Sequence, residues 1–220
     1  MRVKFLSLIL FPILLSCAPI GQSEPENPDV PFTEITESSE FFPLTENAGE
    51  YEFFTNDKAF IKPYGMTFWA PVLAEQPLFT EIDISLSKIS GNPYTGFGVV
   101  FCHGLRGEPL EATMLVLMIN LNQEYIVGEV VKDRFNTLIP WTHSGSLHPG
   151  FNQENRVRIS FNEGQSEFQI YINDMTVALD VFKDDEAPFH RGGTGGFITV
   201  ISPRDKFPEI PVHVLFKNNQ

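Results

Sequence analysis

Apolar and polar residues alternate with a period of two over much of this chain, which favours β-strands over helices. The clearest stretch is residues 155–161, where Val157 and Ile159 alternate with arginines. After a turn at 162–165 the same arrangement continues through residues 167–172. Successive side chains of a strand point to opposite faces of a sheet, so each of these runs predicts one buried face. No segment predicts an amphipathic helix.

The same alternation, punctuated by Gly, Asn, Pro and Asp, predicts an all-β domain from residue 51 onward. The expected strands are 51–55, 66–70, 79–89, 97–103, 113–121, 125–132, 137–141, 156–161, 167–172, 176–179, 196–201 and 212–216. Asn173 and Asp174 tolerate the positive φ that a two-residue hairpin turn demands. We therefore expect three consecutive antiparallel strands over residues 156–179.

The N-terminus carries an export signal. Arg2 and Lys4 precede an apolar run at 5–15. A run of this length suits the roughly 7–15 residue core of a secretory signal and falls short of the roughly 20 residues that a membrane-spanning helix needs. The sequence Leu14-Leu15-Ser16-Cys17 resembles the lipobox of bacterial lipoproteins. The resemblance implies cleavage of residues 1–16, a diacylglyceryl group on Cys17, and a lipid-anchored place in the bacterial cell envelope, at the outer membrane or cell surface.

The chain is acidic, with 15 Lys and Arg against 28 Asp and Glu and a formal net charge of −13. Cleavage of the signal removes two basic residues and leaves 13 against 28, or −15. Nucleic acids and anionic lipid headgroups bind basic surfaces, so this charge argues against both as partners. Eight of the acids lie in residues 18–50, which hold no Lys or Arg and several prolines, a composition that does not fold alone. We expect residues 17–48 to form a disordered tether and 49–220 to fold.

About 170 residues follow the tether, enough for one domain with a substantial core. The chain has two cysteines, so acylation of Cys17 leaves Cys102 without a partner for an intrachain disulfide. Cys102 follows an apolar stretch at 98–101. We interpret it as a buried thiol that packs like a small hydrophobic residue.

Several segments together resemble the concanavalin A-like lectin/glucanase superfamily, which includes laminin G-like domains. They are Asn155-Arg156-Val157, Tyr171-Ile172-Asn173-Asp174, the glycine-rich run 192–197 and the closing run 212–216. The resemblance implies a two-sheet antiparallel jelly-roll sandwich with one concave sheet. It also implies that the first and last strands of the domain, 51–55 and 212–216, lie side by side.

The sequence Glu81-Ile82-Asp83-Ile84-Ser85 is similar to the Glu-x-Asp-x-Glu strand motif of β-glucanases in this superfamily. The resemblance implies Glu81 as nucleophile and Asp83 as supporting carboxylate, but places Ser85 where the acid/base belongs. A retaining glycosidase needs two carboxyl groups about 5–5.5 Å apart, and a serine hydroxyl cannot protonate the leaving sugar oxygen. The alternative, which we favour, is a half-buried strand with two solvated carboxylates. An acid from a distant loop, at Glu108, Glu111 or Glu124, stays open.

Other catalytic and metal-binding patterns are weaker. Ser144-Gly145-Ser146 lies in a turn-rich stretch, and no G-x-S-x-G elbow is present. The histidines have neither the i, i+4 helical spacing nor the H-x-H spacing of a zinc site: His103, His143, His148, His190 and His213. Asp180 and the segment 183–186 offer oxygens to Ca²⁺, which many laminin G-like domains bind, although a solvated acidic turn accounts for them as well. We assign no catalytic residue and no metal ligand, and Ca²⁺ stays a candidate cofactor.

Trp69 and Trp141 are the candidate ligand-binding aromatics. Sugar rings present apolar faces that stack on aromatic planes, while neighbouring polar groups fix the hydroxyls. Trp141 precedes His143 and a loop at 142–150 rich in hydrogen-bonding groups. We take Trp141, His143, Trp69, Glu81 and Asp83 as candidate ligand-binding residues, with core packing as the alternative for both tryptophans.

The function predicted from the sequence is a lipid-anchored binding module of the cell envelope that recognises a glycan or a protein through a face of the jelly roll. A glycoside-active enzyme built on Glu81 and Asp83 is the second hypothesis. A surface antigen without a small-molecule site is the third.

Overall fold

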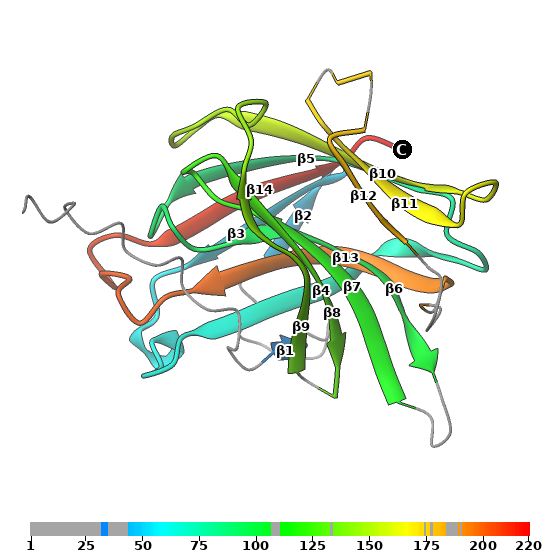
Figure 1. Cartoon of the computed structure of the whole chain (residues 1–220). Coiled ribbons are helices and arrows are strands. Elements are labelled where there is room, and N and C mark those ends of the chain that lie inside the picture. The colour runs from blue at the N-terminus through cyan, green and yellow to red at the C-terminus, as the bar shows by residue number, and fades with distance from the viewer. Residues whose placement is uncertain are drawn as a thin grey trace, which may run out of the picture.

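Two β-sheets pack face to face and enclose the core (Figure 1). The computed structural model describes residues 44–106, 111–132, 134–173, 175–176, 178–183, 189 and 191–220, together with the strand at 32–34. Within these residues each sheet has seven strands. The expected signal peptide, Cys17 and most of the expected tether lie outside the described residues.

The first sheet, which we call the β13 sheet, has the order β1-β4-β13-β6-β7-β8-β9. Neighbouring strands are antiparallel, except that β1 pairs with β4 in parallel register. The strands are β1 (Phe32–Glu34), β4 (Met66–Gln76), β6 (Phe97–Arg106), β7 (Glu111–Ile119), β8 (Glu124–Val131), β9 (Arg134–His143) and β13 (Gly193–Ile201).

The second sheet, the β5 sheet, has the order β12-β11-β10-β5-β14-β3-β2 and is antiparallel throughout. In Figure 1 its central strands β5 and β14 lie above β4 and β13 of the other sheet. The strands are β2 (Leu44–Asn47), β3 (Glu50–Thr55), β5 (Glu81–Ser90), β10 (Glu154–Asn162), β11 (Glu167–Ile172), β12 (Asp180–Lys183) and β14 (Val212–Asn218). A 3-10 turn, η1 (Lys58–Phe60), links the two sheets between β3 and β4. No helix in the described part of the chain is long and apolar enough to cross a membrane.

This architecture confirms the predicted all-β, two-sheet jelly-roll sandwich. The first and last strands of the expected domain lie side by side, with Tyr51 opposite Phe216 and Thr55 opposite Val212. The alternation that predicted β10 and β11 is confirmed as well, since Val157 and Ile170 are fully buried. The first and last strands of the expected domain therefore pair within the β5 sheet, and the period-two pattern identifies the inner face of that sheet.

The core between the sheets is built largely from aromatic rings. Phe168 of β11 stacks on Phe182 of β12 with 4.8 Å between ring centroids. Phe197 of β13 stacks on Phe216 of β14 at 4.5 Å, a contact that joins the two sheets. Offset aromatic pairs of this kind stabilise a core beyond the area that they bury. Cys102 lies in the same core and is 3% exposed, which confirms its interpretation as a packed thiol.

The prediction of a strand at 176–179 after a two-residue turn is wrong. Asn173 does have a positive φ of 54°, but the next strand, β12, begins only at Asp180. The side chain of Asn173 is used elsewhere: its Oδ1 accepts the Arg156 amide at 2.8 Å, and its Nδ2 donates to the Ser146 carbonyl at 2.5 Å. These contacts tie the turn to the neighbouring β9–β10 loop, and the chain runs further before it pairs with β11.

The sheets also extend further toward the N-terminus than the expected boundary at residue 49. Strand β2 pairs with β3 through a turn at Ala48 and Gly49, whose φ values are 52° and 83°. Strand β1 adds to the edge of the β13 sheet beside Trp69 of β4. Neither short strand shows enough alternation to be found from the sequence.

Candidate functional site

Glu81, Asp83 and Ser85 lie on the outer face of the β5 sheet. They alternate along β5 with Ile82 and Ile84, which are 2% and 0% exposed and belong to the core. The neighbouring strand β10 brings arginines opposite them, with Arg158 in register with Asp83. The face is therefore a polar surface in which acids and bases of adjacent strands meet.

The Asp83 carboxylate accepts two hydrogen bonds from Arg156 and one from the side-chain amide of Asn219. Arg156 donates from Nε to Oδ1 at 2.8 Å and from Nη2 to Oδ2 at 2.5 Å, and Asn219 donates from Nδ2 to Oδ1 at 3.1 Å. Burial by itself would raise the pKa of Asp83, but the hydrogen bonds from Arg156 and Asn219 and the charges of Arg156 and Arg158 outweigh it and hold the pKa below its usual value. Asp83 is therefore a carboxylate near neutral pH and not a proton donor.

Glu81 is paired as well. Its Oε2 lies 3.5 Å from Nη1 of Arg158, whose guanidinium carbon lies 4.0 Å from the centre of the Tyr171 ring. The hydroxyl of Ser85 accepts a hydrogen bond from Asn219 at 3.2 Å. Each candidate catalytic carboxylate therefore pairs with an arginine. Ser85, which stands where the acid/base residue was expected, is hydrogen-bonded to the side-chain amide of Asn219.

The more distant acids do not complete the motif. Glu111 pairs with Lys132 at 2.5 Å, and Glu124 accepts a hydrogen bond from Asn120 at 2.8 Å. Both belong to the β13 sheet, whereas Glu81 belongs to the β5 sheet. Glu108 lies outside the described residues.

The candidate tryptophans lie in the β13 sheet, so the structure does not bring them together with Glu81 and Asp83. Trp69 is 3% exposed and packs edge-on against His103 with 4.7 Å between ring centroids. Its burial leaves no ring face for a sugar. Trp141 on β9 is half-buried against the apolar cluster that contains Trp69. Among the described residues its buried Nε1 has no hydrogen-bond partner. His143, two residues further along β9, is exposed.

A cavity of about 580 Å³ lies at the end of the sandwich where β5 finishes and β14 begins. The start of β14 is at the left-hand side of Figure 1. The walls of the cavity come from the loops that join β5 to β6, β9 to β10, and β13 to β14. Three large apolar side chains in these walls are exposed: Tyr94 at 39%, Phe151 at 40% and Ile210 at 42%. We call this cavity the end pocket. Single exposed apolar residues are common, but three around one cavity of this size are typical of a ligand site.

The loops of the end pocket are fixed by polar contacts. Asp205 accepts hydrogen bonds from the amides of Asn92 at 2.8 Å and Ser202 at 2.7 Å, so it joins two of the three loops. Ser90 donates to the Pro211 carbonyl at 2.6 Å. The amide of Asn152, next to Phe151, donates to the Lys88 carbonyl at 2.9 Å and joins the third loop to β5. The walls are therefore held in place without a ligand.

No protein-family model matches the chain, and no curated protein sequence matches it. Solved structures do match. The β-glucanase of Bacillus licheniformis aligns with a TM-score of 0.51 and 5% identity over 81% of this chain and 82% of that chain. LamAcat from Zobellia galactanivorans aligns with a TM-score of 0.50 and 9% identity over 88% of this chain and 85% of that chain. The chain has the jelly-roll fold of the β-glucanases.

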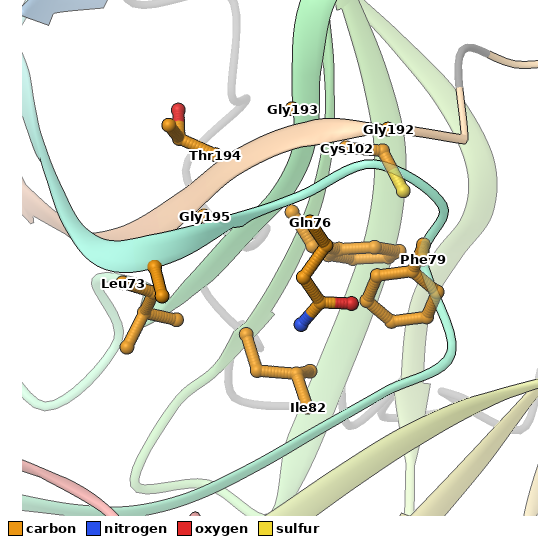
Figure 2. A pocket seen from close by; sticks show the side chains of 11 residues that line it. Leu73, Gln76, Phe79, Ile82, Cys102, Gly192, Gly193, Thr194 and Gly195 are labelled. Carbon is orange, nitrogen blue, oxygen red and sulfur yellow. The ribbon is translucent and has the colours of Figure 1, made fainter.

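The glycine run that helped to suggest this jelly roll has a packing role. A Cβ at Gly193 would lie 1.8 Å from the His103 carbonyl oxygen, and one at Gly196 would lie 1.7 Å from that of Ala70. These glycines let β13 approach its two neighbours closely. Figure 2 shows the cavity beside Gly193, with Cys102 and Phe79 on its wall. Its volume of about 10 Å³ is roughly that of one water molecule, so this space is a packing defect and not a ligand site.

The calcium prediction stays a prediction. Among the described residues no three His, Cys, Asp or Glu side chains gather to hold a metal ion. Residues 184–186 lie outside the described part, and the carboxylate of Asp180 accepts hydrogen bonds from the Tyr125 hydroxyl and the Val181 amide, both at 2.8 Å.

Sequence reasoning missed the residues of the end pocket. Tyr94 follows Gly91-Asn92-Pro93, and Phe151 follows Pro149-Gly150. Both are aromatic residues inside turns of the jelly roll, where the chain runs over the surface. The sequence signal that could have identified them is an aromatic residue flanked by turn-forming residues. An aromatic side chain in such a turn has no strand face on which it can be buried.

Proposed function

We propose that this protein is a lipid-anchored module of the bacterial cell envelope that binds a glycan in the end pocket. The observation that carries the proposal is the gathering of exposed Tyr94, Phe151 and Ile210 around one cavity of about 580 Å³. Aromatic planes pack against the CH faces of sugar rings, and the cavity lies within the usual 300–1,000 Å³ of ligand sites.

The polar groups around the end pocket suit the same kind of ligand. Asn92, Ser90, Arg204 and Lys206 line the cavity beside the aromatic rings. A sugar needs apolar contact on its faces and hydrogen bonds around its edge, and this lining offers both. The jelly-roll fold, shared with a β-glucanase, supports a carbohydrate ligand only as an analogy, because a fold hosts many functions.

The enzymatic alternative is less well supported. Asp83 and Glu81 are both paired with arginines, and the lowered pKa of Asp83 opposes a role as acid. Neither the end pocket nor a cavity of about 560 Å³ beside Lys132 and Arg134 is lined by Glu81 or Asp83. Release of reducing ends from β-glucans by the purified protein, abolished by Glu81→Gln, would establish hydrolysis and displace the binding-module proposal.

The direct test is a glycan array probed with labelled full-length protein purified in detergent. We expect bound glycans whose affinity falls about tenfold in Tyr94→Ala or Phe151→Ala, since loss of one aromatic contact costs on the order of 1–1.5 kcal/mol. Tyr64→Ala is the matched control, because Tyr64 is 81% exposed and does not line the end pocket. An array without any bound glycan, or equal losses in the Tyr64 and Tyr94 variants, would refute the proposal.

A further inference from the structure

Exposed apolar side chains continue beyond the end pocket onto the outer face of the β5 sheet. Phe54 of β3 is 45% exposed and Leu215 of β14 is 39% exposed, and neither lines the end pocket. Leu215 lies opposite Glu52, two residues from Phe54, so the two apolar side chains are diagonal neighbours about 7–8 Å apart. We call Phe54, Leu215, Glu52 and the adjacent His213 the outer patch.

His213 of β14 joins the outer patch to the end pocket. Strand β14 lies between β3 and β5 (Figure 1). His213 is paired with Phe54 on one side and with Ser90, a lining residue of the end pocket, on the other. Adjacent strands lie about 4.8 Å apart, so the Phe54 backbone is about 10 Å from this wall of the pocket. The end pocket and the outer patch are therefore parts of one surface.

A bulge in β5 lies where the two parts meet. Ser90 pairs with His213 and Lys88 pairs with Val214, so Ile89 is an extra residue in the ladder. Bulges at sheet edges and strand ends re-aim side chains, and Ile89 also lines the end pocket. The bulge therefore gives the surface an apolar side chain between the pocket and β14.

The outer patch offers an aromatic ring beside a carboxylate. The rings of Phe54 and His213 pack edge to face with 5.5 Å between centroids. The Nε2 atom of His213 is buried and lies 2.8 Å from Oε1 of Glu52, although not in hydrogen-bond geometry. The Glu52 side chain is 48% exposed, so its carboxylate is the polar group that a ligand meets. It accepts hydrogen bonds from sugar hydroxyls and repels an anion.

We propose that the end pocket and the outer patch together bind a neutral oligosaccharide chain, with one end of the chain in the pocket and the following sugars on Phe54. This inference rests on the glycan-binding function proposed above and adds a second subsite to it. A cavity of about 580 Å³ holds a ligand of ordinary small-molecule size and not a polysaccharide. A longer chain has to leave the pocket, and the outer patch gives it a second aromatic contact.

A protein partner fits the outer patch less well. A stable protein interface buries about 1,000 Å² or more with good complementarity. Outside the end pocket the patch has two exposed apolar side chains, and past Leu215 the same face continues into the ion pairs of Lys217 with Glu50 and of Arg156 with Asp83. A narrow apolar patch of this kind suits a single chain of sugars.

The test measures how affinity depends on chain length. The full-length protein, purified in detergent, is titrated calorimetrically with oligosaccharides of two and of six sugars. The probes come from neutral polymers of glucose, mannose, galactose and N-acetylglucosamine. We expect at least one hexasaccharide to bind about three- to tenfold more tightly than its disaccharide, because it reaches one more aromatic ring.

Variants assign this preference to Phe54. Phe54→Ala should lower the affinity for the hexasaccharide to that for the disaccharide and leave the disaccharide unchanged, whereas Tyr94→Ala should weaken both. Phe54→Trp keeps an aromatic plane and should keep the preference for the longer chain. Tyr64→Ala is the matched control, because Tyr64 is 81% exposed and lies outside both the end pocket and the outer patch. Thermal melting checks that each variant is folded.

Equal affinities for the two lengths in every series would overturn the second subsite while glycan binding in the end pocket stands. Equal losses for both lengths in Phe54→Ala, or a hexasaccharide affinity in Phe54→Ala that matches Tyr64→Ala, would overturn it too. Glycans bound on the array with no neutral probe bound in titration would overturn the neutral chain. An array without any bound glycan would remove the proposed function itself.

Discussion

At the residue scale, the arginines of β10 decide what the carboxylates of β5 can do. Glu81 and Asp83 resemble the catalytic strand of a glucanase, but Arg156 and Arg158 lie on the adjacent strand and engage both. The alternation of β10 already indicated that its arginines point away from the core. What the sequence did not contain was the register that sets Arg158 opposite Asp83, because strand pairing joins residues far apart in the chain.

The pairing of Asp83 predicts a pH-dependent contribution to stability. Its pKa is below the usual value of 3.8 in the folded protein, so its contribution is full above that value and is lost as the pH falls through the folded pKa. Asp83→Asn should lower the free energy of unfolding by about 1.5–3 kcal/mol at pH 7, since hydrogen bonds to charged partners contribute roughly that much. The difference from the wild type should shrink below pH 3.8. Denaturant unfolding at several pH values measures it.

Glu163→Gln is the control for this experiment, because Glu163 pairs with Arg191 at 3.2 Å but is itself 64% exposed. Exposed pairs contribute about 0–1 kcal/mol. Equal stability of Asp83→Asn and the wild type from pH 3 to 7 would show that the Arg156 pair contributes nothing.

Gly196 offers a second prediction at this scale. A Cβ there would lie 1.7 Å from the Ala70 carbonyl oxygen and 2.7 Å from the carbonyl carbon, so β4 and β13 would have to separate. Gly196→Ala should therefore destabilise the protein by about 1–3 kcal/mol or more. Gly145→Ala is the control, because its Cβ would meet no atom within 4 Å. Thermal melting compares the two, and a Gly196 variant as stable as the Gly145 variant would contradict the close approach.

At the element scale, β14 is the strand on which the β5 sheet depends. It lies between β3 and β5, and Val214 is fully buried while its neighbour Leu215 is 39% exposed. Removal of residues 211–220 would leave the main-chain groups of two strands unpaired and uncover the core. We expect that truncated chain to be unfolded, as judged by loss of a cooperative melting transition.

Point variants on β14 refine this prediction. Val214→Ala should cost about 2 kcal/mol, because a buried valine contributes roughly 1.5–3 kcal/mol. Leu215→Ala should change the free energy of unfolding little. A truncated chain that still melts cooperatively would show that the sheet closes without β14.

Most of the elements were predictable because their burial is one-sided. Strands such as β10 and β11 bury one face, so their alternation fixes both their type and their orientation. Strands β1 and β2 have only three and four residues, which is too short for alternation to show. Strand β12 begins later in the chain than predicted, because the Asn173 side chain forms a hydrogen bond with a loop that is distant in sequence. The sequence did not predict the end pocket for a related reason. Its loops are far apart in the chain and come together only in the folded structure.

At the scale of the whole molecule, the two ends of the sandwich have different chemistry. The C-terminal residues Asn219 and Gln220 lie at the end where β5 begins, with Gln220 donating to the Glu81 carbonyl at 2.8 Å. The end pocket lies at the opposite end, where β5 finishes and β14 begins. The exposed aromatic residues of the end pocket are therefore separated along the strands from the ion-paired face of Glu81 and Asp83.

The last prediction concerns the place of the whole molecule in the cell. The lipobox-like sequence Leu14-Leu15-Ser16-Cys17 predicts that Cys17 carries the anchor, and a lipid-modified cysteine with more than one acyl chain holds a protein stably at a membrane. Cys17→Ala should move the protein from the membrane fraction into the soluble or secreted fraction, or leave its signal uncleaved. Cys102→Ala is the matched control, because Cys102 lies buried in the core and should not affect localisation. Intact-mass analysis of the membrane-extracted protein should show an N-terminal cysteine with added acyl mass. An unmodified N-terminus, or a Cys17→Ala protein that fractionates like the wild type, would contradict the lipid anchor and leave glycan binding in the end pocket to be judged separately.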